Sequence, residues 1–253
     1  MPAPGSLIGQ GTRALVARVS GGALKLLRVA LYVDGFNLYH ALEKLNQPHL
    51  KWLNLWALGE RLLTRGQHRL VRVFYASAKK DDNPEKSERH QEYINALKSV
   101  NVEVCLGHFL AEAVIECRKC GHHWNDNREK ETDINLALAI IDDAYQDVFD
   151  VAFLVTADSD QAATARVLTE RFPEKRLVSI VPPNMAASKA IKTYAPLTVH
   201  LREFMIAECL FPQSATQVVG GKEITTYRRP SDYDPPPNWT PAMHKNALRK
   251  GRY

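Results

Sequence analysis

The sequence predicts an α/β fold, a three-layer α/β/α sandwich around a mostly parallel central sheet. Two buried-type apolar runs are each followed directly by acidic residues, and segments with helical periodicity separate these runs from further apolar ones. Strands that alternate with helices pair in parallel through right-handed crossovers, which place helices on both faces of the sheet. The composition agrees, because 45% hydrophobic and 24% charged residues are ordinary for a globular domain.

We expect one globular domain at residues 28–210. It lies between a flexible tail at 1–27 and an extended or disordered, basic, Pro-rich tail at 211–253. The first 22 residues lack the apolar core of a signal peptide, and the apolar stretch 23–33 is too short to cross a membrane. These features predict a cytoplasmic protein with reduced cysteines and no membrane partner.

Strands and helices alternate through the first half of the domain, because β-rich apolar runs exchange with segments whose apolar residues recur at spacings of three and four. Strands are expected at 28–33, 69–75 and 102–106, and helices at 37–45, 53–63 and 85–100. The rhythm breaks at 107–128, where two cysteines, several histidines and a tryptophan indicate a small Cys-containing insertion, either a hairpin or a knuckle.

The alternation resumes after the insertion. Thr132 can cap a helix that runs to about residue 146, with Asp133 in its first turn. Apolar residues recur along one face of this helix at Ile134, Leu138, Ile141 and Tyr145. The remaining elements are expected as a strand at 151–156, a helix at 161–171, a strand at 176–181, a helix at 186–194 and a short strand at 197–200.

Acidic residues follow two of the predicted strands. Asp34 comes directly after the first strand, and Asp158 and Asp160 follow strand 151–156. Ligands of open parallel sheets bind at the carboxyl ends of the strands, and the helix that begins near Asp133 starts on that side. Carboxylates in one crevice repel one another, and a hard cation such as Mg²⁺ or Mn²⁺ relieves that repulsion. Such a site could activate a water and neutralise a scissile phosphate, which favours phosphodiester hydrolysis.

Each acid also has an ordinary structural explanation. Asp133 could be a helix N-terminal acid, Asp158 or Asp160 could cap the next helix, and Asp34 with Gly35 could form a turn. Other hydrolases fit less well, because the first strand lacks a D-x-D-x-T/V nucleophile block typical of phosphatase-like enzymes. No G-x-G-x-x-G follows that strand, which argues against a dinucleotide site.

Three blocks of the sequence resemble the signatures of the NYN domain family, within the PIN-like nuclease superfamily. They are 33–38 (VDGFNL), 131–138 (ETDINLAL) and 154–160 (LVTADSD), and the resemblance extends over about 28–203. It implies a PIN-like fold and an endoribonuclease that depends on Mg²⁺ or Mn²⁺. Related domains also persist as inactive RNA-binding or protein-interaction modules, and that alternative stays open.

The resemblance also implies roles for individual residues. The acids that would bind the catalytic metal are Asp34, Asp133, Asp158 and Asp160. Asn37 would orient one of these acids or contact the substrate phosphate, and Ser159 would bond the backbone or a carboxylate unless it only caps a helix. The chain departs from the family at Ala157, where glycine is common, and at Gln161, where an apolar residue is common.

The insertion contains a C-x-x-C-G turn, Cys117 to Gly121, which is typical of one half of a zinc knuckle. The sequence has no second ligand pair at standard spacing, so the candidates for the other ligands are Cys105, His108, His122 and His123. Structural Zn²⁺ binding and reduced thiols without a metal both stay open.

The charge favours a polyanionic partner, because 33 basic residues against 28 acidic ones give a formal net charge of +5 and a pI near 9.0. Cations expected near the substrate backbone are Lys79, Lys80, Arg118 and Lys119, although a solvated charged face is the default for such runs. We therefore expect RNA, single-stranded or structured, as the partner. A homo-oligomer is compatible with the sequence.

Overall fold

The computed structural model describes residues 25–78, 83–110, 114–116, 119–125 and 128–244. Four of the residues singled out above lie outside these ranges: Lys79, Lys80, Cys117 and Arg118. The backbone of His108 is described but its side chain is not.

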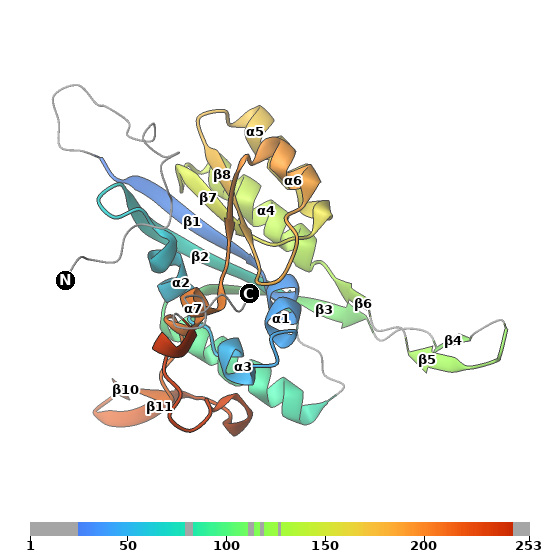
Figure 1. Ribbon diagram of the computed structural model, residues 1–253, viewed down its shortest axis with the longest axis vertical. Helices are drawn as coiled ribbons and strands as arrows, with labels where there is room; N and C mark the ends of the chain where they lie inside the picture. Colours follow the sequence, from blue (N-terminus) through green and yellow to red (C-terminus); the bar gives the residue numbers. More distant parts are fainter. Residues whose placement is uncertain (1–24, 79–82, 111–113, 117–118, 126–127, 245–253) are drawn as a thin grey trace.

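The described part of the chain forms a seven-stranded sheet in the order β6-β3-β2-β1-β7-β8-β9 (Figure 1). The strands are β1 (Leu27–Asp34), β2 (His68–Ala78), β3 (Glu103–Leu110), β6 (Arg128–Lys130), β7 (Val151–Val155), β8 (Arg176–Val181) and β9 (Leu197–His200). All neighbours are parallel except β6, which pairs antiparallel with β3. The strand order reverses between β1 and β7, so their carboxyl ends form the switch point of the sheet.

Helices cover both faces of this sheet (Figure 1), so the expected three-layer α/β/α architecture is confirmed. One face packs against α1 (Gly35–Glu43), α2 (Leu55–Leu62), α3 (Pro84–Ser99) and α7 (Glu203–Ala207). The other packs against α4 (Thr132–Tyr145), α5 (Ala162–Arg171) and α6 (Lys189–Tyr194). Short 3-10 turns η1 (Pro48–Lys51), η2 (Ser159–Gln161) and η3 (Ser231–Tyr233) complete the helical elements described.

The side chains of β1 alternate between the two cores, as a strand buried on both faces requires. Its inner positions are Val29, Leu31 and Val33 on the α1 side, and Ala30 and Tyr32 on the α4 side. The same alternation turns the residue after Val33 toward α4. The end of β1 therefore delivers its acid to the α4 side of the sheet.

Helix α4 starts differently from the expectation. Its N-cap is Glu131, which has a left-handed backbone with φ 76°, and Thr132 is a buried residue of the first turn instead of the cap. Asp133 lies in that first turn, as the sequence predicts. A polar residue at the helix start does not by itself fix which residue adopts the cap conformation.

The buried face of α4 also differs. Three of the four apolar side chains that the periodicity singles out are largely solvent-exposed, at 62%, 61% and 72% for Ile134, Leu138 and Tyr145, whereas Ile141 is half-buried against the core. The helix instead buries Leu136 and Ile140 against the sheet. Apolar residues occupy more than one side of this helix, so periodicity alone could not choose the face.

Residues 211–244 pack onto the domain, where the sequence predicts an extended tail. They contain an antiparallel hairpin of β10 (Ser214–Val219) and β11 (Lys222–Arg228). Tyr227 of this hairpin is buried, and its ring lies 5.8 Å from that of Trp52. Separate aromatic residues such as Tyr227 hold this segment on the domain. An isolated aromatic residue leaves no periodic pattern in the sequence, so these contacts could not be predicted.

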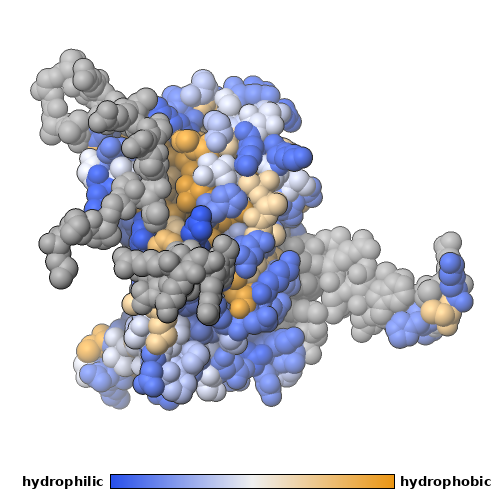
Figure 2. Space-filling model, in the orientation of Figure 1, coloured by the Kyte–Doolittle hydropathy of each residue, from blue (hydrophilic) through white to orange (hydrophobic). Residues whose placement is uncertain are grey.

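The insertion contains a second antiparallel hairpin, formed by β4 (Val114–Glu116) and β5 (His123–Asn125). Figure 1 shows it projecting outward beyond β3 and β6. Figure 2 shows hydrophilic side chains over most of the visible face of the molecule, with hydrophobic ones gathered in a band across its middle. Among the described residues, no helix combines the length and apolar character needed to cross a membrane.

Candidate functional site

Asp34 ends β1 at the switch point of the sheet and is almost completely buried, with 3% of its surface exposed. Its Oδ1 accepts a hydrogen bond from the Asn37 backbone N–H at 2.9 Å, which caps α1. Its Oδ2 accepts one from the Thr156 hydroxyl at 2.8 Å. Val33 of β1 pairs with Val155 of β7, so Asp34 and Thr156 come level at the same edge.

The loop after β7 is tied to Asp34 by two side chains. The Thr156 hydroxyl donates to Asp34, and its oxygen accepts a hydrogen bond from the Asp158 N–H at 3.0 Å. Asn37 Oδ1 accepts one from the Ala157 N–H at 2.9 Å. The Asn37 side chain therefore orients the backbone of the acidic loop. Together these bonds hold Asp34, at the end of β1, and Asp158, after β7, side by side.

Asp158 also caps the short turn η2, because its Oδ1 accepts a hydrogen bond from the Asp160 N–H at 3.0 Å. Asp158 is half-buried, whereas Ser159 and Asp160 are exposed. The capping role and a ligand role are compatible, since the cap engages one oxygen of the carboxylate. Ser159 and Asp160 lie at the solvent side of this turn.

A buried glutamine positions the start of α4. Gln161 is 2% exposed, and its Nε2 donates a hydrogen bond to the backbone carbonyl of Asp133 at 3.1 Å. Its Oε1 accepts one from the Thr164 hydroxyl at 2.9 Å. The Gln161 side chain thus makes a polar connection between η2 and α4. We identify Thr156, which sequence reasoning did not single out, and Gln161, for which it predicted no such role, as positioning residues.

The acids act on one another electrostatically. Burial raises the pKa of Asp34 to about 6, and the charges of Asp133 and Asp158 contribute to the rise, while its hydrogen bonds to Asn37 and Thr156 oppose it. Three of the four predicted acids therefore share one neighbourhood, with Asp160 at its rim. Their oxygens are the donors that a hard divalent cation prefers. Within the described residues, however, no three His, Cys, Asp or Glu side chains already form a group that could hold a metal ion.

The buried carboxyl of Asp34 predicts a pH-dependent stability of the metal-free protein. Its pKa rises from 3.8 to about 6 on folding, so the folded state binds the proton more tightly than the unfolded chain. The contribution of this carboxyl to the free energy of unfolding should therefore fall, by roughly 2 kcal/mol, as the pH rises from about 4 to about 6. Urea unfolding in EDTA across this range measures the slope. Asp34→Asn should flatten it, and parallel slopes for the two proteins would contradict the assignment.

The residues of the cysteine segment do not all come together. Cys120, His122 and His123 are exposed at the β4–β5 hairpin, as is Lys119. Cys105 lies in β3 and packs against the core on the α4 side, where burial raises the pKa of its thiol. The structure therefore places Cys105 in the sheet and Cys120 on the outward hairpin (Figure 1). Zinc binding by Cys117 and Cys120 stays a prediction.

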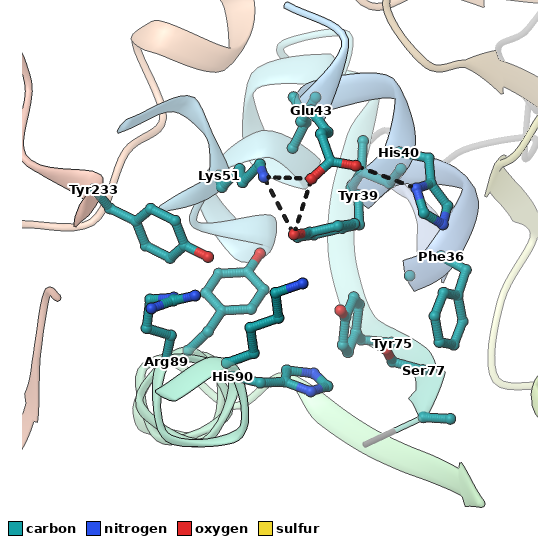
Figure 3. A pocket seen from close by; sticks show the side chains of 16 residues that line it. Phe36, Tyr39, His40, Glu43, Lys51, Tyr75, Ser77, Arg89, His90 and Tyr233 are labelled. Atoms are coloured by element: carbon teal, nitrogen blue, oxygen red, sulfur yellow. Dashed lines mark hydrogen bonds and ion pairs between the residues drawn. The ribbon is translucent and has the colours of Figure 1, made fainter. Parts of the chain in front are cut away.

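A pocket of about 420 Å³ lies on the α1 side of the sheet, next to the residue that follows Asp34 (Figure 3). Its aromatic lining residues are Phe36, Tyr39, Tyr75, Tyr93 and Tyr233. Its charged and titratable ones are His40, Glu43, Lys51, Lys86, Arg89 and His90. Sequence reasoning missed this pocket because its walls come from segments that are far apart in the chain.

Comparisons with known proteins include a family model, a curated relative and a solved structure. A family model described as the NYN domain matches residues 28–197. The chain is 24% identical over 238 residues to 6-hydroxy-3-succinoylpyridine 3-monooxygenase HspA of Pseudomonas putida (strain DSM 28022 / S16), over 79% of this chain and 73% of that protein. A crystal structure of a protein of unknown function from Vibrio parahaemolyticus RIMD 2210633 is 19% identical with a TM-score of 0.45, over 74% of this chain and 97% of that one.

Proposed function

Because the chain belongs to the NYN domain family, within the PIN-like ribonuclease superfamily, we propose that it is an endoribonuclease that hydrolyses RNA phosphodiester bonds. The acids that would bind Mg²⁺ or Mn²⁺ are Asp34, Asp133, Asp158 and Asp160. A bound cation would supply positive charge at the scissile phosphate and lower the pKa of the attacking water.

The observation that carries the proposal is the pair of connections between the ends of β1 and β7. Thr156 bonds both the Asp34 carboxylate and the Asp158 backbone, and Asn37 bonds the loop between them. These bonds fix two carboxylates at the switch point, where open α/β sheets bind their ligands. Preorganised acids cost little rearrangement when a cation binds, which is the requirement for a catalytic metal site.

The other residues have supporting roles in this proposal. Gln161 bonds the Asp133 carbonyl in the first turn of α4, which supports a role for Asp133 at the same edge of the sheet. Ser159 and Asp160 are exposed beside Asp158, where Ser159 would contact the substrate phosphate and Asp160 would bind the metal from the solvent side. Lys119, on the projecting hairpin, would contact the RNA backbone away from the cleaved bond.

Cleavage of a fluorescent RNA with and without a divalent cation tests the proposal. We expect purified protein to cleave single-stranded RNA in Mn²⁺ or Mg²⁺ and to lose that activity in EDTA, because the acids alone cannot neutralise the scissile phosphate. Cleavage that survives EDTA would exclude a metal-dependent mechanism. RNA binding without cleavage of any single-stranded or structured RNA would instead favour an inactive RNA-binding module.

The pocket suggests a second candidate function, which is the binding of a small aromatic molecule that carries a carboxylate. The name of the P. putida relative indicates a hydroxylated pyridine with a succinoyl chain, which is an aromatic ring that carries a carboxylate. A pocket with aromatic walls and several cations has the chemistry to hold such a molecule. Direct titration of the protein with 6-hydroxy-3-succinoylpyridine tests this candidate, and the absence of binding would remove it.

A further inference from the structure

The pocket beside Asp34 is a groove between two helices that face each other across a hollow. Its α1 wall consists of positions spaced by three and four: Phe36, Tyr39, His40 and Glu43. The α3 wall repeats the same spacing with Lys86, Arg89, His90 and Tyr93. We call this hollow the α1–α3 groove. Figure 3 shows side chains of α1 on one side of the hollow, and Arg89 and His90 on the opposite side.

The composition of the two walls is unusual for a seam between packed helices. Residues at these spacings form one helix face, and a face that serves only to pack on its neighbour is normally aliphatic. Here both faces carry aromatic rings, the α3 face also carries cations, and a hollow of about 420 Å³ separates them. That volume lies within the roughly 300–1,000 Å³ range of small-ligand sites. The groove is therefore suited to a ligand.

The charges in the groove favour an anion. Glu43 is the acid among its lining residues, and it is already engaged by Lys51, whose Nζ lies 3.2 Å from its Oε1. Arg89 is half-buried and forms ion pairs with Asp232 at 2.8 Å and with Glu85 at 3.9 Å. Lys86 is exposed one turn before Arg89 on the same wall. The α3 wall thus presents Lys86 as an exposed cation and Arg89 as a cation fixed in position by its acids, and both can meet a phosphate group.

The aromatic side chains favour a flat ring between the walls. Tyr39 is 38% exposed on α1, and its hydroxyl is held by Lys51 at 3.2 Å. Tyr75 forms part of the floor, and Tyr233 of η3 closes one end of the hollow (Figure 3). Aromatic side chains stack on any nucleobase, because every base has a π-face.

The groove adjoins the acidic edge. Gly35, which directly follows Asp34, is itself a lining residue of the groove, and a Cβ at Gly35 would lie 2.8 Å from the Tyr75 ring and 2.6 Å from the Ala76 carbonyl oxygen. The floor of the groove therefore packs directly against the residue that follows Asp34. Asp34 points to the α4 side and the groove lies on the α1 side, so a chain that crosses the carboxyl edge of the sheet could contact both.

We infer that the α1–α3 groove binds one unpaired nucleotide of the RNA substrate, with its base among the tyrosines and its phosphate on the α3 cations. This inference rests on the proposed function and extends it to the form of the RNA. A base that is paired in a duplex cannot enter a groove between two helices. The enzyme therefore selects single-stranded RNA or unpaired loops over duplex RNA.

Fluorescence anisotropy with a labelled single-stranded oligoribonucleotide, in EDTA, tests the groove without cleavage. We expect Tyr39→Ala to weaken binding roughly tenfold, while Tyr39→Phe, which keeps the ring, binds like the wild type. Lys86→Gln should also weaken binding and reduce its dependence on salt. Tyr145→Ala is the matched control, because Tyr145 is a more exposed tyrosine on α4 and should leave binding unchanged.

Three results would overturn the inference: wild-type affinity in both Tyr39→Ala and Lys86→Gln, equal affinity for a duplex of the same sequence, or displacement by 6-hydroxy-3-succinoylpyridine but not by AMP. These binding measurements contain no divalent cation, so a result that overturns the groove inference would not contradict metal-dependent cleavage. If the wild-type protein binds RNA in the groove but does not cleave RNA in Mn²⁺ or Mg²⁺, only the nuclease proposal is overturned.

Discussion

We expect Asp34→Asn to lower the rate of metal-dependent RNA cleavage roughly a thousandfold while the protein stays folded. A metal at a scissile phosphate contributes several kcal/mol of charge stabilisation, and each tenfold in rate corresponds to about 1.4 kcal/mol. The change removes a negative ligand at the centre of the site. Asparagine has nearly the same shape, and it also caps helices well, so the start of α1 should persist.

Single-turnover cleavage at saturating Mn²⁺, with circular dichroism melting as the check on folding, measures this effect. Asp142→Asn is the matched control, because Asp142 is an exposed acid of α4 outside the proposed site. Its variant should cleave RNA like the wild type. Unchanged cleavage by Asp34→Asn, and by a double variant that adds Asp158→Asn, would show that the reaction takes place elsewhere.

Trp52→Ala should destabilise the protein by about 3–5 kcal/mol, which is typical for removal of a large buried aromatic side chain. Trp52 is completely buried, and its Nε1 donates a hydrogen bond to the Pro212 carbonyl at 3.0 Å. Its ring lies 5.9 Å from those of Tyr93 and Phe211, and 5.8 Å from that of Tyr227. The variant therefore loses both core packing and the main anchor of residues 211–244.

Urea unfolding gives the loss of stability, and limited proteolysis reports whether the β10–β11 hairpin detaches. Trp56→Ala serves as the control, since Trp56 is a half-buried tryptophan of α2 at the edge of the same core. We expect a smaller loss for that variant and no release of the hairpin. A Trp52→Ala protein that is no less stable than Trp56→Ala would contradict this account of the C-terminal segment.

The sequence was sufficient for the architecture because apolar strands and periodic helices are local patterns. The strands expected at 28–33, 69–75, 102–106, 151–156, 176–181 and 197–200 correspond to β1, β2, β3, β7, β8 and β9. Strand β6 was not expected, since its three residues, Arg-Glu-Lys, have no apolar pattern and depend on pairing with β3. The β10–β11 hairpin was not expected either, because its formation also depends on pairing between strands.

The candidate site could be predicted only in part. The acids at the end of β1 and in the loop after β7 are visible in the sequence, and the sheet rule brings both to one edge. The bonds that hold them together join residues 120 positions apart, such as Asn37 with Ala157, and no local pattern encodes such a pairing. Gln161 gave a signal, as a polar residue where the family usually has an apolar one, but its bond to Asp133 needed the tertiary structure.

The α1–α3 groove had no local signal either. Its walls are two ordinary helix faces, and only the packing of α1, α3 and η3 around β2 turns them into one hollow. The exposed apolar side chains of α4 show the converse problem, because a regular apolar spacing there does not mark the buried face.

The location of a bound divalent cation tests the central claim most directly. Anomalous difference maps from crystals soaked in Mn²⁺, at concentrations that support cleavage, would show it. We predict a manganese peak at the switch point, coordinated by carboxylate oxygens of Asp34 and Asp158. An ordered manganese ion at another site, with no peak beside Asp34, would contradict the claim.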